Sequence, residues 1–390
     1  MFNKQSEKKN EYMADRYRKR GYDWWWHSFT GKSKATGKER AFFIEFFIVN
    51  PKLSPNQVVL GQGQENTGKK KKRPSYLMIK CGSWGENKKQ LHRFFPLSEA
   101  EIVKRPFSVR AGDCFLNETE TRGSVCVPEE EANEATMSDS GSMSWNLTID
   151  KKIAFDVGYG TSPFFVTLKA FEMYWHAQGI KTQYSGVVTY EGEEYEVIPE
   201  TSYGYADKNW GRDFTSPWLG LSSNKIRRQG SEEWLENTAF DIGGGTPKVF
   251  GISIPNQLLG AFVVEGKEYE MNFSKFWTLT KTDFYFRDRG EEARWHVELT
   301  NREYKIVTDV RCKTEEMLSL NYETPMGERK HTRLYNGGTG YGTIKFYKRG
   351  RMKFTLIDTL ECFSVGCEYG EAEKDEDEED ERDRYRYRYY

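Results

Sequence analysis

Short apolar runs recur along this chain, and residues that favour turns separate them. Ala41 to Val49 reads AFFIEFFIV and is closed by Asn50-Pro51, a turn signal. After residue 25, no stretch keeps apolar residues at i, i+3 and i+4 long enough for a dominant helix, apart from a turn near Ser98 to Val103. The pattern predicts an all-β protein of antiparallel strands, as in barrels and sandwiches.

Two predicted hairpin turns have nearly the same sequence. YEGEEYEV turns at Glu191-Gly192 and VEGKEYEM turns at Glu265-Gly266, with alternating strand-like segments on both sides. The repetition suggests that one β-module occurs twice in the chain. A further antiparallel hairpin is predicted around Lys348 to Arg351.

Two glycine-rich stretches stand out, NGGTGYG from Asn336 to Gly342 and the triplet Gly243 to Gly245. A phosphate-binding loop leads into a helix whose N-terminus holds the anion. The first stretch leads instead into TIKFYK, an alternating segment that reads as a strand. Both stretches are therefore predicted to be turns.

Composition supports a β protein with many rings inside it. The 390 residues include 25 Phe, 23 Tyr and 11 Trp, which suit a half-buried pleated surface, and 35 Gly, which suit tight turns. A chain of this length has room for two domains. The formal net charge of −1 does not indicate the concentrated basic surface that nucleic-acid binding requires, so no nucleic-acid partner is expected.

The two ends of the chain differ from its middle. Residues 1–20 are predicted to form a basic N-terminal arm, either a short helix or a loose segment, and residues 370–390 a disordered charged tail. The N-terminus lacks the apolar core of a secretory signal, and no apolar stretch reaches the roughly 20 residues of a transmembrane helix. We expect a cytoplasmic protein, for which transient contact with a membrane surface stays open.

The six cysteines are scattered along the chain, without a CxxC pair or a histidine at metal-ligand spacing. Free thiols in a reducing compartment are the simplest interpretation of this spacing. No metal site and no cofactor are expected.

The segment from Phe171 to Trp218 gathers residues suited to acid chemistry. Electrophilic addition to a carbon–carbon double bond needs a carboxylic acid that stays protonated near neutral pH. Burial among aromatic rings achieves this by raising a carboxyl pKa by up to roughly 3–5 units. Ring faces then stabilise the carbocation by about 1–2 kcal/mol each in a dry site. Asp207 is the candidate donor, with Tyr205 two residues away on the same strand face.

Other residues of this segment complete the hypothesis. His176 or Lys208 could hold the proton balance of the site. A structural interpretation competes with the catalytic one, because DKNWG could be a strand end with an ion pair, an Asn-capped turn and a core tryptophan, and Trp175-His176 could be core packing. The residues expected to line the ligand are Trp175, Tyr203, Asn209, Trp210 and Trp218.

Several blocks of the sequence resemble the tocopherol cyclase family and, more distantly, the carotenoid hydratases of the same lipocalin-like superfamily. The order and spacing of these blocks match along roughly Gly21 to Cys367. The tyrosine–x–acid–x–asparagine–tryptophan–glycine core is the most specific part. The blocks are GYDWWWHSFTG with ERAFFIEFFIVNP (Gly21 to Pro51), MYWHAQG (Met173 to Gly179), GYADKNWGRDFTSPW (Gly204 to Trp218) and AFDIGGG (Ala239 to Gly245).

The resemblance implies two lipocalin-like antiparallel β-barrel domains packed side by side, residues 21–215 and 216–369, with a hydrophobic ligand between or inside them. It also implies a reaction. Plant cyclases close a chromanol ring by protonating a prenyl double bond so that a quinol oxygen attacks. The hydratases protonate a terminal isoprenoid alkene with a Tyr-x-Asp arrangement, which falls on Tyr205 and Asp207. Their His and Trp partners correspond loosely to His176 and Trp175.

The chain departs from the plant cyclase pattern. It has Asp207 where those enzymes have Glu, and Thr215-Ser216-Pro217 where they have basic residues. No plastid transit peptide is recognised in it. A shorter acid still donates a proton, but the substrate must be placed differently, so tocopherol itself is not the expected product.

The triplet Trp24-Trp25-Trp26 has two interpretations. In lipocalin-like barrels an N-terminal tryptophan commonly plugs the closed end, and this structural role is the expected one. Lining the ligand cavity is the second interpretation.

Three functions follow from these observations. The favoured one is a cofactor-free cyclase, or a hydratase using the same step, that protonates an alkene of a prenylated or polyene small molecule. The second is a non-catalytic carrier or sensor of a similar hydrophobic ligand. The third is a pericyclase, in which positioning alone contributes roughly 7–11 kcal/mol and no solvent proton enters the product.

Overall fold

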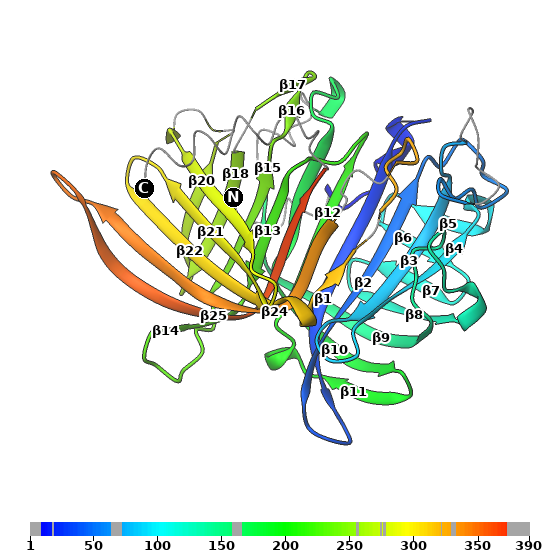
Figure 1. The fold of residues 1–390 in the computed structure, drawn as a ribbon, viewed down its shortest axis with the longest axis horizontal. Helices are drawn as coiled ribbons and strands as arrows, with labels where there is room; N and C mark the ends of the chain where they lie inside the picture. The colour runs from blue at the N-terminus through cyan, green and yellow to red at the C-terminus, as the bar shows by residue number, and fades with distance from the viewer. Residues whose placement is uncertain are drawn as a thin grey trace.

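The computed structural model consists of two rolled antiparallel β-sheets that lie side by side (Figure 1). It describes residues 9–17, 19–63, 72–157, 166–254, 257–273, 275, 278–320, 322–328 and 333–372. Helical structure in these residues is confined to short turns, so the all-β prediction with two barrel-like sheets is confirmed. The 3-10 turns are η2 (Ala14–Tyr17), η4 (Leu97–Glu99), η5 (Glu129–Glu131), η7 (Pro199–Thr201) and η9 (Thr314–Glu316).

The first sheet comes from the N-terminal half of the chain. Its strands run in the order β4-β3-β2-β1-β11-β10-β9-β8-β7-β6-β5, and β12 pairs with both β1 and β10. The interior of this sheet is an apolar core that contains Trp25, Phe42 and Phe46. The strands are β1 (Tyr22–Ser33), β2 (Glu39–Val49), β3 (Tyr76–Ser83), β4 (Lys89–Phe95), β5 (Ala100–Val103), β6 (Ser108–Ala111), β7 (Cys114–Asn117), β8 (Glu120–Val127), β9 (Gly141–Phe155), β10 (Met173–Tyr190), β11 (Glu193–Val197) and β12 (Gly204–Gly211).

The second sheet comes from the C-terminal half. Its main path is β19-β18-β15-β13-β25-β24-β22-β21-β20, with β14 and β23 at its side and the small pair β16-β17 separate from it. Trp295, Phe262 and Phe346 belong to its own apolar core. The strands are β13 (Trp218–Ser223), β14 (Lys225–Arg228), β15 (Ala239–Gly245), β16 (Lys248–Val249), β17 (Ile252–Ser253), β18 (Gln257–Val264), β19 (Lys267–Asn272), β20 (Lys281–Asp288), β21 (Glu292–Thr300), β22 (Tyr304–Lys313), β23 (Leu318–Ser319), β24 (Arg333–Arg349) and β25 (Phe354–Glu371).

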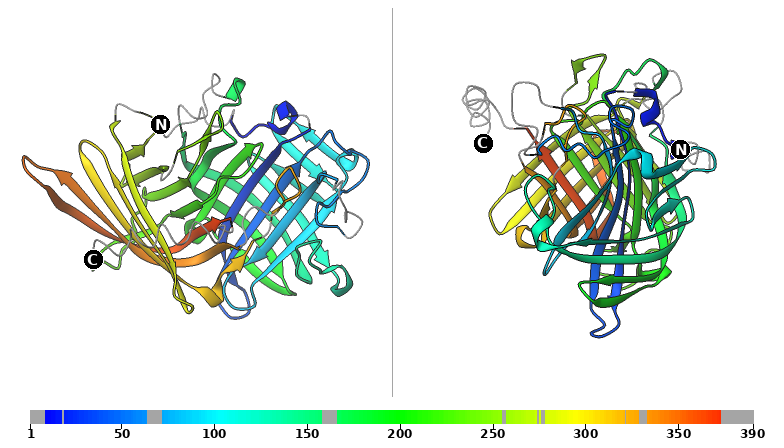
Figure 2. Two further views of the ribbon diagram at one scale, coloured as in Figure 1. Left: turned by 45° about the horizontal axis from the view of Figure 1, so that its top comes forward. Right: turned by 90° about the vertical axis from the view of Figure 1, so that its right-hand side faces the viewer.

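The two sheets meet along strands near the middle of the molecule (Figure 2). Small side chains such as Ala177 of β10 and Ala261 of β18 share one buried cluster there, which lets the strands of the two sheets approach closely. The side chain of Asn224 then bridges the sheets. Its Nδ2 donates hydrogen bonds to the backbone oxygens of Ile180 (3.1 Å) and Gly204 (2.8 Å).

A segment of the second half also crosses to the first sheet. We call residues 318–328, of which residue 321 is not described, the crossing segment. The hydroxyl of Tyr322 donates to Oε2 of Glu45 (2.8 Å). The carboxylate of Glu323 accepts hydrogen bonds from the backbone N–H groups of Gly61 (2.9 Å) and Gln62 (2.6 Å). The crossing segment therefore fixes the second sheet against the first at a point far from β10 in sequence.

The predicted hairpins are confirmed. β10 and β11 join at Glu191-Gly192, and β18 and β19 join at Glu265-Gly266. The two residues of each turn have positive φ angles, 50° and 80° in the first and 47° and 80° in the second. Turns of this kind match the twist of the flanking strands and favour glycine at the second position. The third hairpin joins β24 to β25, around Gly350.

The glycine-rich stretches are strands, and the prediction that they form turns was wrong. Gly243–Gly245 ends β15, and Asn336–Gly342 lies inside β24. Their glycines serve close approach instead, because a Cβ on Gly243 would lie 3.1 Å from the ring of Trp175. That ring belongs to the other sheet, so the local sequence could not reveal it.

The N-terminal residues that are described pack against the first sheet rather than forming a loose arm. The backbone N–H of Ala14 donates to the carboxylate of Asp23 (2.7 Å), and Nε1 of Trp25 donates to the backbone oxygen of Asn10 (2.7 Å). The disordered tail was predicted for residues 370–390. Gly370 and Glu371 instead end β25, and residues 373–390 lie outside the described part of the chain. Among the helices that are described, none is both long and apolar enough to cross a bilayer.

Candidate functional site

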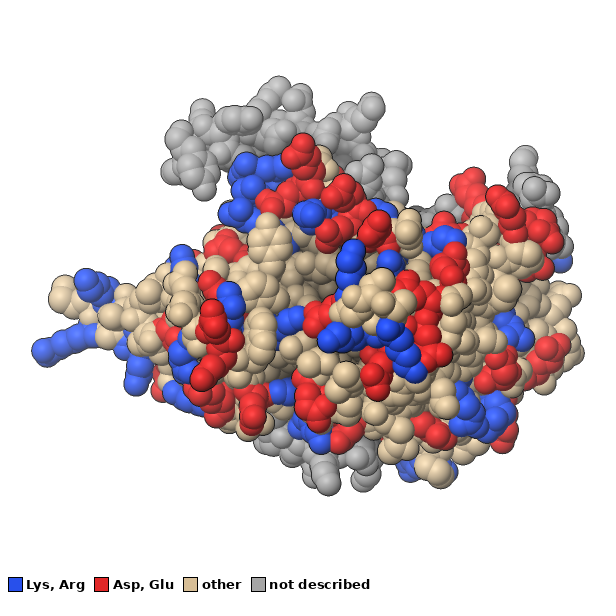
Figure 3. Space-filling model, turned by 90° about the horizontal axis from the view of Figure 1, so that it is seen from below, with Lys and Arg blue, Asp and Glu red and all other residues tan. Residues whose placement is uncertain are grey.

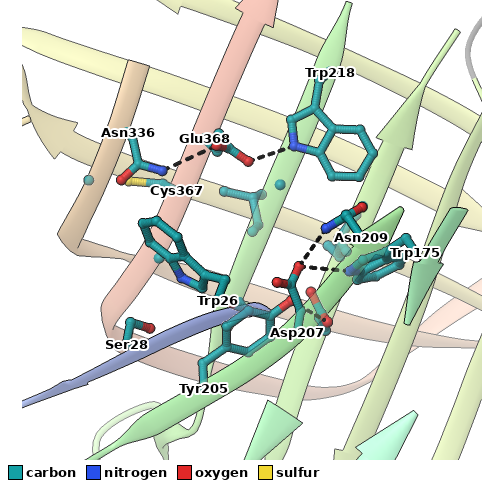
Figure 4. A pocket seen from close by; sticks show the side chains of 18 of the residues that line it. Trp26, Ser28, Trp175, Tyr205, Asp207, Asn209, Trp218, Asn336, Cys367 and Glu368 are labelled. Atoms are coloured by element: carbon teal, nitrogen blue, oxygen red, sulfur yellow. Dashed lines mark hydrogen bonds between the residues drawn. The ribbon is translucent and has the colours of Figure 1, made fainter. Parts of the chain in front are cut away.

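A cavity of about 70 Å³ lies where the two sheets face each other, and we call it the acid cavity (Figure 4). The first sheet contributes residues of β1, β10 and β12 to its wall, and the second sheet contributes residues of β13, β15, β24 and β25. Tyr322 of the crossing segment closes part of the wall. The cavity is therefore built between the sheets, not inside either of them.

Alternation along two neighbouring strands places one row of side chains on this wall. β1 and β12 are antiparallel, and every second residue of each strand points to the same face. As a result, three cross-strand pairs line the acid cavity together. The pairs are Trp24 with Asn209, Trp26 with Asp207 and Ser28 with Tyr205.

The carboxyl group of Asp207 is held at one of its two oxygens. Oδ2 accepts hydrogen bonds from Nε1 of Trp175 (3.0 Å) and Nδ2 of Asn209 (3.2 Å). Oδ1 has no hydrogen-bond partner among the described residues, although Asp207 is only 8 % exposed. Two donors on Oδ2 suit a neutral acid whose carbonyl oxygen is Oδ2 and whose proton is on Oδ1.

The environment of Asp207 keeps this proton in place. Burial, followed by the nearby carboxyl of Glu368, raises the pKa of Asp207 to about 8, against the opposing effect of the hydrogen bond from Trp175. A carboxyl with such a pKa is mostly protonated at neutral pH. Asp207 can therefore act as an acid under physiological conditions.

Asp241 of β15 is a second buried carboxyl. It belongs to the second sheet and lines the acid cavity together with Asp207. Burial, followed by the charge of Asp207, raises the pKa of Asp241 well above its ordinary value. The hydroxyl of Tyr205 donates to Oδ2 of Asp241 (3.1 Å) and so connects the two sheets beside the acid.

Glu368 of β25 is the third carboxyl of the acid cavity, and both of its oxygens have partners. Oε2 accepts a hydrogen bond from Nε1 of Trp218 (2.6 Å), and Oε1 accepts one from Nδ2 of Asn336 (3.2 Å). Burial raises its pKa, whereas these two hydrogen bonds lower it. Despite the three carboxyls, no cluster of metal-binding side chains is found within the described residues.

Lys208 lies on the opposite face of β12 from Asp207. Its Nζ forms an ion pair with Asp23 and lies 3.7 Å from the centre of the Trp25 ring, so it points into the first sheet. Burial lowers the pKa of Lys208 to about 8, while Asp23 opposes this shift. The proton-balancing role predicted for Lys208 does not fit this placement, because strand alternation turns it away from the acid cavity.

His176 shares the face of Lys208, since the two residues are register partners on β10 and β12. Burial lowers the pKa of His176 to about 3, so the ring is neutral. The structure brings neither His176 nor Lys208 to Asp207. The predicted role of His176 in proton balance therefore does not fit its placement either. Trp210 is also on this side, stacked on Tyr174 with ring centres 5.4 Å apart.

Tyr203 lies outside the acid cavity as well. It precedes β12 with φ of 42°, its ring lies near Trp234, and Nζ of Lys225 is 4.4 Å from the ring centre. Of the residues predicted to line the ligand, the structure brings Trp175, Asn209 and Trp218 to the wall, together with Asp207 and Tyr205.

The tryptophan triplet divides between its two interpretations. Trp25 is fully buried in the core of the first sheet, as a structural role requires. Trp24 and Trp26 point the other way and line the acid cavity. A period of two along β1 explains the division, because consecutive side chains of a strand face opposite sides.

Sequence reasoning missed several residues of the wall. Asp241 and Glu368 each offered a signal, since both are acids inside otherwise apolar or small-residue strand segments, AFDIGGG and SVGCEYG. Tyr322 and Asn336 offered none, because tertiary packing alone brings them to the acid cavity.

The acid cavity is smaller than a chamber for an oily guest. Its volume of about 70 Å³ is well below the roughly 300–1,000 Å³ of pockets that enclose ordinary small-molecule ligands. Tryptophan rings fill much of the surrounding space, and Trp26, Trp84, Trp175 and Trp218 all border it. A prenylated molecule can enter only when at least one of these rings moves.

Two solved structures with low sequence identity are similar along most of their length. A protein from Nitrosomonas europaea described as AttH has 12% identity and a TM-score of 0.46, with 91% of this chain and 96% of that chain covered. Kievitone hydratase from Nectria haematococca has 11% identity and a TM-score of 0.39, with 90% and 89% covered. No curated protein sequence matches the chain.

A family model gives the assignment. The model described as tocopherol cyclase-like matches residues 59–370. The match begins after β2, so the block from Gly21 to Pro51 lies outside it, whereas Asp207, Asp241 and Glu368 lie within it. The matched range covers most of the chain, and the protein therefore belongs to the tocopherol cyclase-like family.

Proposed function

We propose that this protein is a cofactor-free enzyme that protonates a carbon–carbon double bond of a prenylated or polyene small molecule. The observation that carries the proposal is Asp207, a buried carboxyl with a pKa of about 8 and an unpartnered Oδ1 at a cavity walled by rings. Tocopherol cyclase-like ring closure, an isomerisation, is the favoured outcome. Hydration of the same alkene is the other outcome of the same first step.

The proposed reaction needs no redox partner. The alkene π electrons take the proton from Oδ1 of Asp207, which leaves a carboxylate and a carbocation. The faces of Trp26 and Trp175 stabilise the cation, by about 1–2 kcal/mol each in a dry site. An oxygen lone pair then forms the C–O bond, and the proton released from that oxygen returns to Asp207. The enzyme ends in its starting state.

The source of the oxygen decides between ring closure and hydration. A hydroxyl of the substrate gives a ring, and water gives an alcohol. Glu368 and Asn336 offer hydrogen-bonding groups at the wall formed by the second sheet, where a hydroxylated head group can be held. This polar end favours a substrate that brings its own hydroxyl, and so favours ring closure.

The experiment uses the full chain, a prenylated hydroquinone and heavy water. Asp207→Asn should lower turnover by about 10²- to 10⁴-fold, because it removes the general acid. Asp283→Asn, the same change at an exposed position of β20, should leave turnover unchanged. The product should contain one deuterium at the protonated carbon.

The other possible results of this experiment distinguish the competing functions. Unchanged turnover in Asp207→Asn would reject the proposal. Turnover without deuterium uptake would identify a pericyclase. Tight binding without any turnover, equal in the wild type and Asp207→Asn, would identify the non-catalytic carrier. Lipids extracted from the purified protein and identified by mass spectrometry would supply the next substrates to test.

We further propose that the two sheets act as two domains, residues 21–215 and 216–369, with the reaction at their interface. All six cysteines are free, which supports a reducing compartment such as the cytoplasm. An enzyme for a hydrophobic substrate in that compartment benefits from contact with membranes, where such molecules partition.

We propose that the tip of the β24–β25 hairpin makes this contact. The tip extends beyond the rest of the second sheet, and basic side chains gather at that end of the molecule (Figures 1 and 3). Met352 is 98 % exposed, and Leu356 is 49 % exposed. The basic residues around them are Lys348, Arg349, Arg351 and Lys353. Each cation near an anionic lipid surface contributes about 1 kcal/mol.

Vesicle sedimentation tests this contact. The wild type should bind phosphatidylserine-containing vesicles and lose binding by several-fold in Met352→Asp and Arg351→Glu. Lys281→Glu, at an exposed position of β20, is the matched charge control. Charged residues at a strand end also prevent edge-to-edge aggregation. If neither tip variant changes vesicle binding, that protective role is the better explanation of the tip.

A further inference from the structure

A second cavity of about 70 Å³ lies directly behind the acid cavity, and we call it the apolar cavity. Its wall is formed almost entirely by hydrocarbon and ring surfaces, with Leu259 and Phe273 from the second sheet and Val157 from the end of the first. Among its lining residues, the polar side chains are those of Thr215, Gln257 and Tyr174. An apolar compartment of this kind suits a hydrocarbon group and offers little to a polar one.

The two cavities share one wall. Trp175, Trp218 and Gly243 line both of them. The two indoles meet edge to face, with centres 6.4 Å apart and planes at 82°. Trp175 lies next to Asp207, and Trp218 lies next to Glu368 (Figure 4). Because Trp175 also donates to Asp207, the apolar cavity begins one ring away from the proposed proton donor.

Trp218 also borders a third, smaller space. This cavity of about 20 Å³ is lined by Trp24, Phe214 and Leu334 in addition to Trp218. All three cavities therefore surround one indole. Movement of that single side chain would join them into one continuous compartment.

The two indoles of the shared wall differ in how firmly they are held. Trp175 is 6 % exposed, and the close approach of Gly243 fixes its ring. Trp218 is only partly buried, at the first position of β13, and one hydrogen bond, to Oε2 of Glu368, holds its Nε1. A hydroxyl of a bound head group can replace that bond at Glu368. Of the two rings, Trp218 is the one that can move.

We propose that the apolar cavity receives the hydrocarbon tail of the substrate and that Trp218 is the gate that admits it. A substrate of the proposed function would then lie with its hydroxylated head at Glu368, its alkene at Asp207 and its isoprenoid tail past Trp218 toward Leu259. This inference rests on the proposed function for the position of the alkene. Its own content is the tail site and the gate.

The gate explains how a prenylated substrate can enter a site whose acid cavity is too small for it. Each cavity alone, at about 70 Å³, is far smaller than the roughly 300–1,000 Å³ of ordinary ligand pockets, so a prenylated molecule needs more room than either provides while Trp218 keeps its present position. With Trp218 displaced, the two become ends of one site, polar at Glu368 and apolar at Leu259. Each methylene buried at the apolar end should then raise affinity by about fourfold.

A ladder of tail lengths tests the proposal. The probes are one hydroquinone head with a dimethylallyl, a geranyl or a farnesyl tail, and affinity is measured by calorimetry on the full chain. Leu259→Trp fills the far end of the apolar cavity. It should weaken the geranyl and farnesyl probes by at least tenfold and leave the dimethylallyl probe within about twofold. Leu279→Trp, at an exposed position just before β20, is the matched control and should change none of them.

Trp218→Ala tests the gate. Removal of the indole joins the cavities permanently, so the long-tailed probes should gain affinity relative to the dimethylallyl probe by at least fivefold. Val157→Phe fills the apolar cavity from the first sheet and replaces Leu259→Trp if that variant does not fold, as judged by circular dichroism. Equal effects on all three probes, or failure of the wild type to bind any of them, would overturn the proposal.

The result separates this proposal from the proposed function. The same ladder is measured in the Asp207→Asn background, where no turnover is expected. Tail-length selectivity that persists there supports the tail site even if Asp207 proves unnecessary for turnover. If tail-length selectivity is absent although turnover depends on Asp207, the tail site is rejected and the role of Asp207 as the acid is retained.

Discussion

Asp207 and Lys208 are consecutive residues of β12, yet their side chains meet opposite environments. Lys208 points into the first sheet, where its ammonium group pairs with the carboxylate of Asp23. Asp207 points to the interface between the sheets, where the nearest ionisable groups, Asp241 and Glu368, are also carboxyls. One face of the strand has a balanced pair of charges. The other has three acids, of which Glu368 interacts with a cation, Lys80, whereas Asp207 and Asp241 have no cation among the main influences on their pKa values.

The difference separates a structural use of buried charge from a chemical one. Burial disfavours the charged form on both faces. Burial also raises the pKa of Asp23, but Lys208 and two backbone N–H groups, from Met13 and Ala14, oppose this shift and favour the ionised pair, which fixes the N-terminal segment. Asp207 has no such compensation, so its neutral form has the lower free energy. The same strand thus provides stability on one side and a transferable proton on the other.

Breaking the balanced pair should have the largest effect of any single substitution on stability at neutral pH. Lys208→Met leaves the Asp23 carboxylate buried without a counter-charge, which should lower the free energy of unfolding by about 3–5 kcal/mol. Urea unfolding would measure the loss, with Lys281→Met at an exposed position as the control. The double variant Asp23→Asn/Lys208→Met should recover most of it, because no uncompensated charge remains and the side-chain oxygen at position 23 can still accept from Met13 and Ala14. A loss below about 1 kcal/mol in the single variant would show that the two faces do not differ as described.

The face with the three acids should make the free energy of unfolding depend on pH. Folded Asp207 keeps its proton up to about pH 8, whereas the unfolded carboxyl releases it near the ordinary pKa of 3.8. Between these values the unfolded state binds fewer protons, so the contribution of Asp207 to the free energy of unfolding falls as pH rises, by about 1.4 kcal/mol per unit. Asp207→Asn lacks this slope.

Unfolding of the wild type and Asp207→Asn at several pH values measures the effect. The difference in stability should grow in favour of the variant from about pH 4 to pH 8 and become constant above that. Turnover of the wild type should fall above about pH 8, where Asp207 loses its proton. A stability difference that is independent of pH would mean that Asp207 ionises normally, and the contrast with Lys208 would disappear.

The features that the sequence predicted correctly are local ones. The turns at Glu191-Gly192 and Glu265-Gly266 need positive φ angles, and that need is visible in two adjacent residues. Alternation also predicts that Lys208 faces away from Asp207, so the proton-balancing role assigned to it conflicted with the pattern itself. The glycines of the two glycine-rich stretches could not be interpreted this way. A Cβ on Gly338 would lie 2.3 Å from the ring of Trp84, which belongs to the other half of the chain.

The smallest expected effect concerns the link between the acids. Tyr205→Phe removes the hydrogen bond to Asp241 but leaves Asp207, its donors from Trp175 and Asn209, and the ring itself in place. One such bond contributes about 0.5–1.5 kcal/mol, so turnover should fall by no more than about tenfold, far less than in Asp207→Asn. Tyr285→Phe, at a partly exposed ring of β20, controls for loss of a hydroxyl. If Tyr205→Phe instead abolished turnover as completely as Asp207→Asn, the proton would have to pass through the tyrosine, and Asp207 would not be the group that meets the alkene.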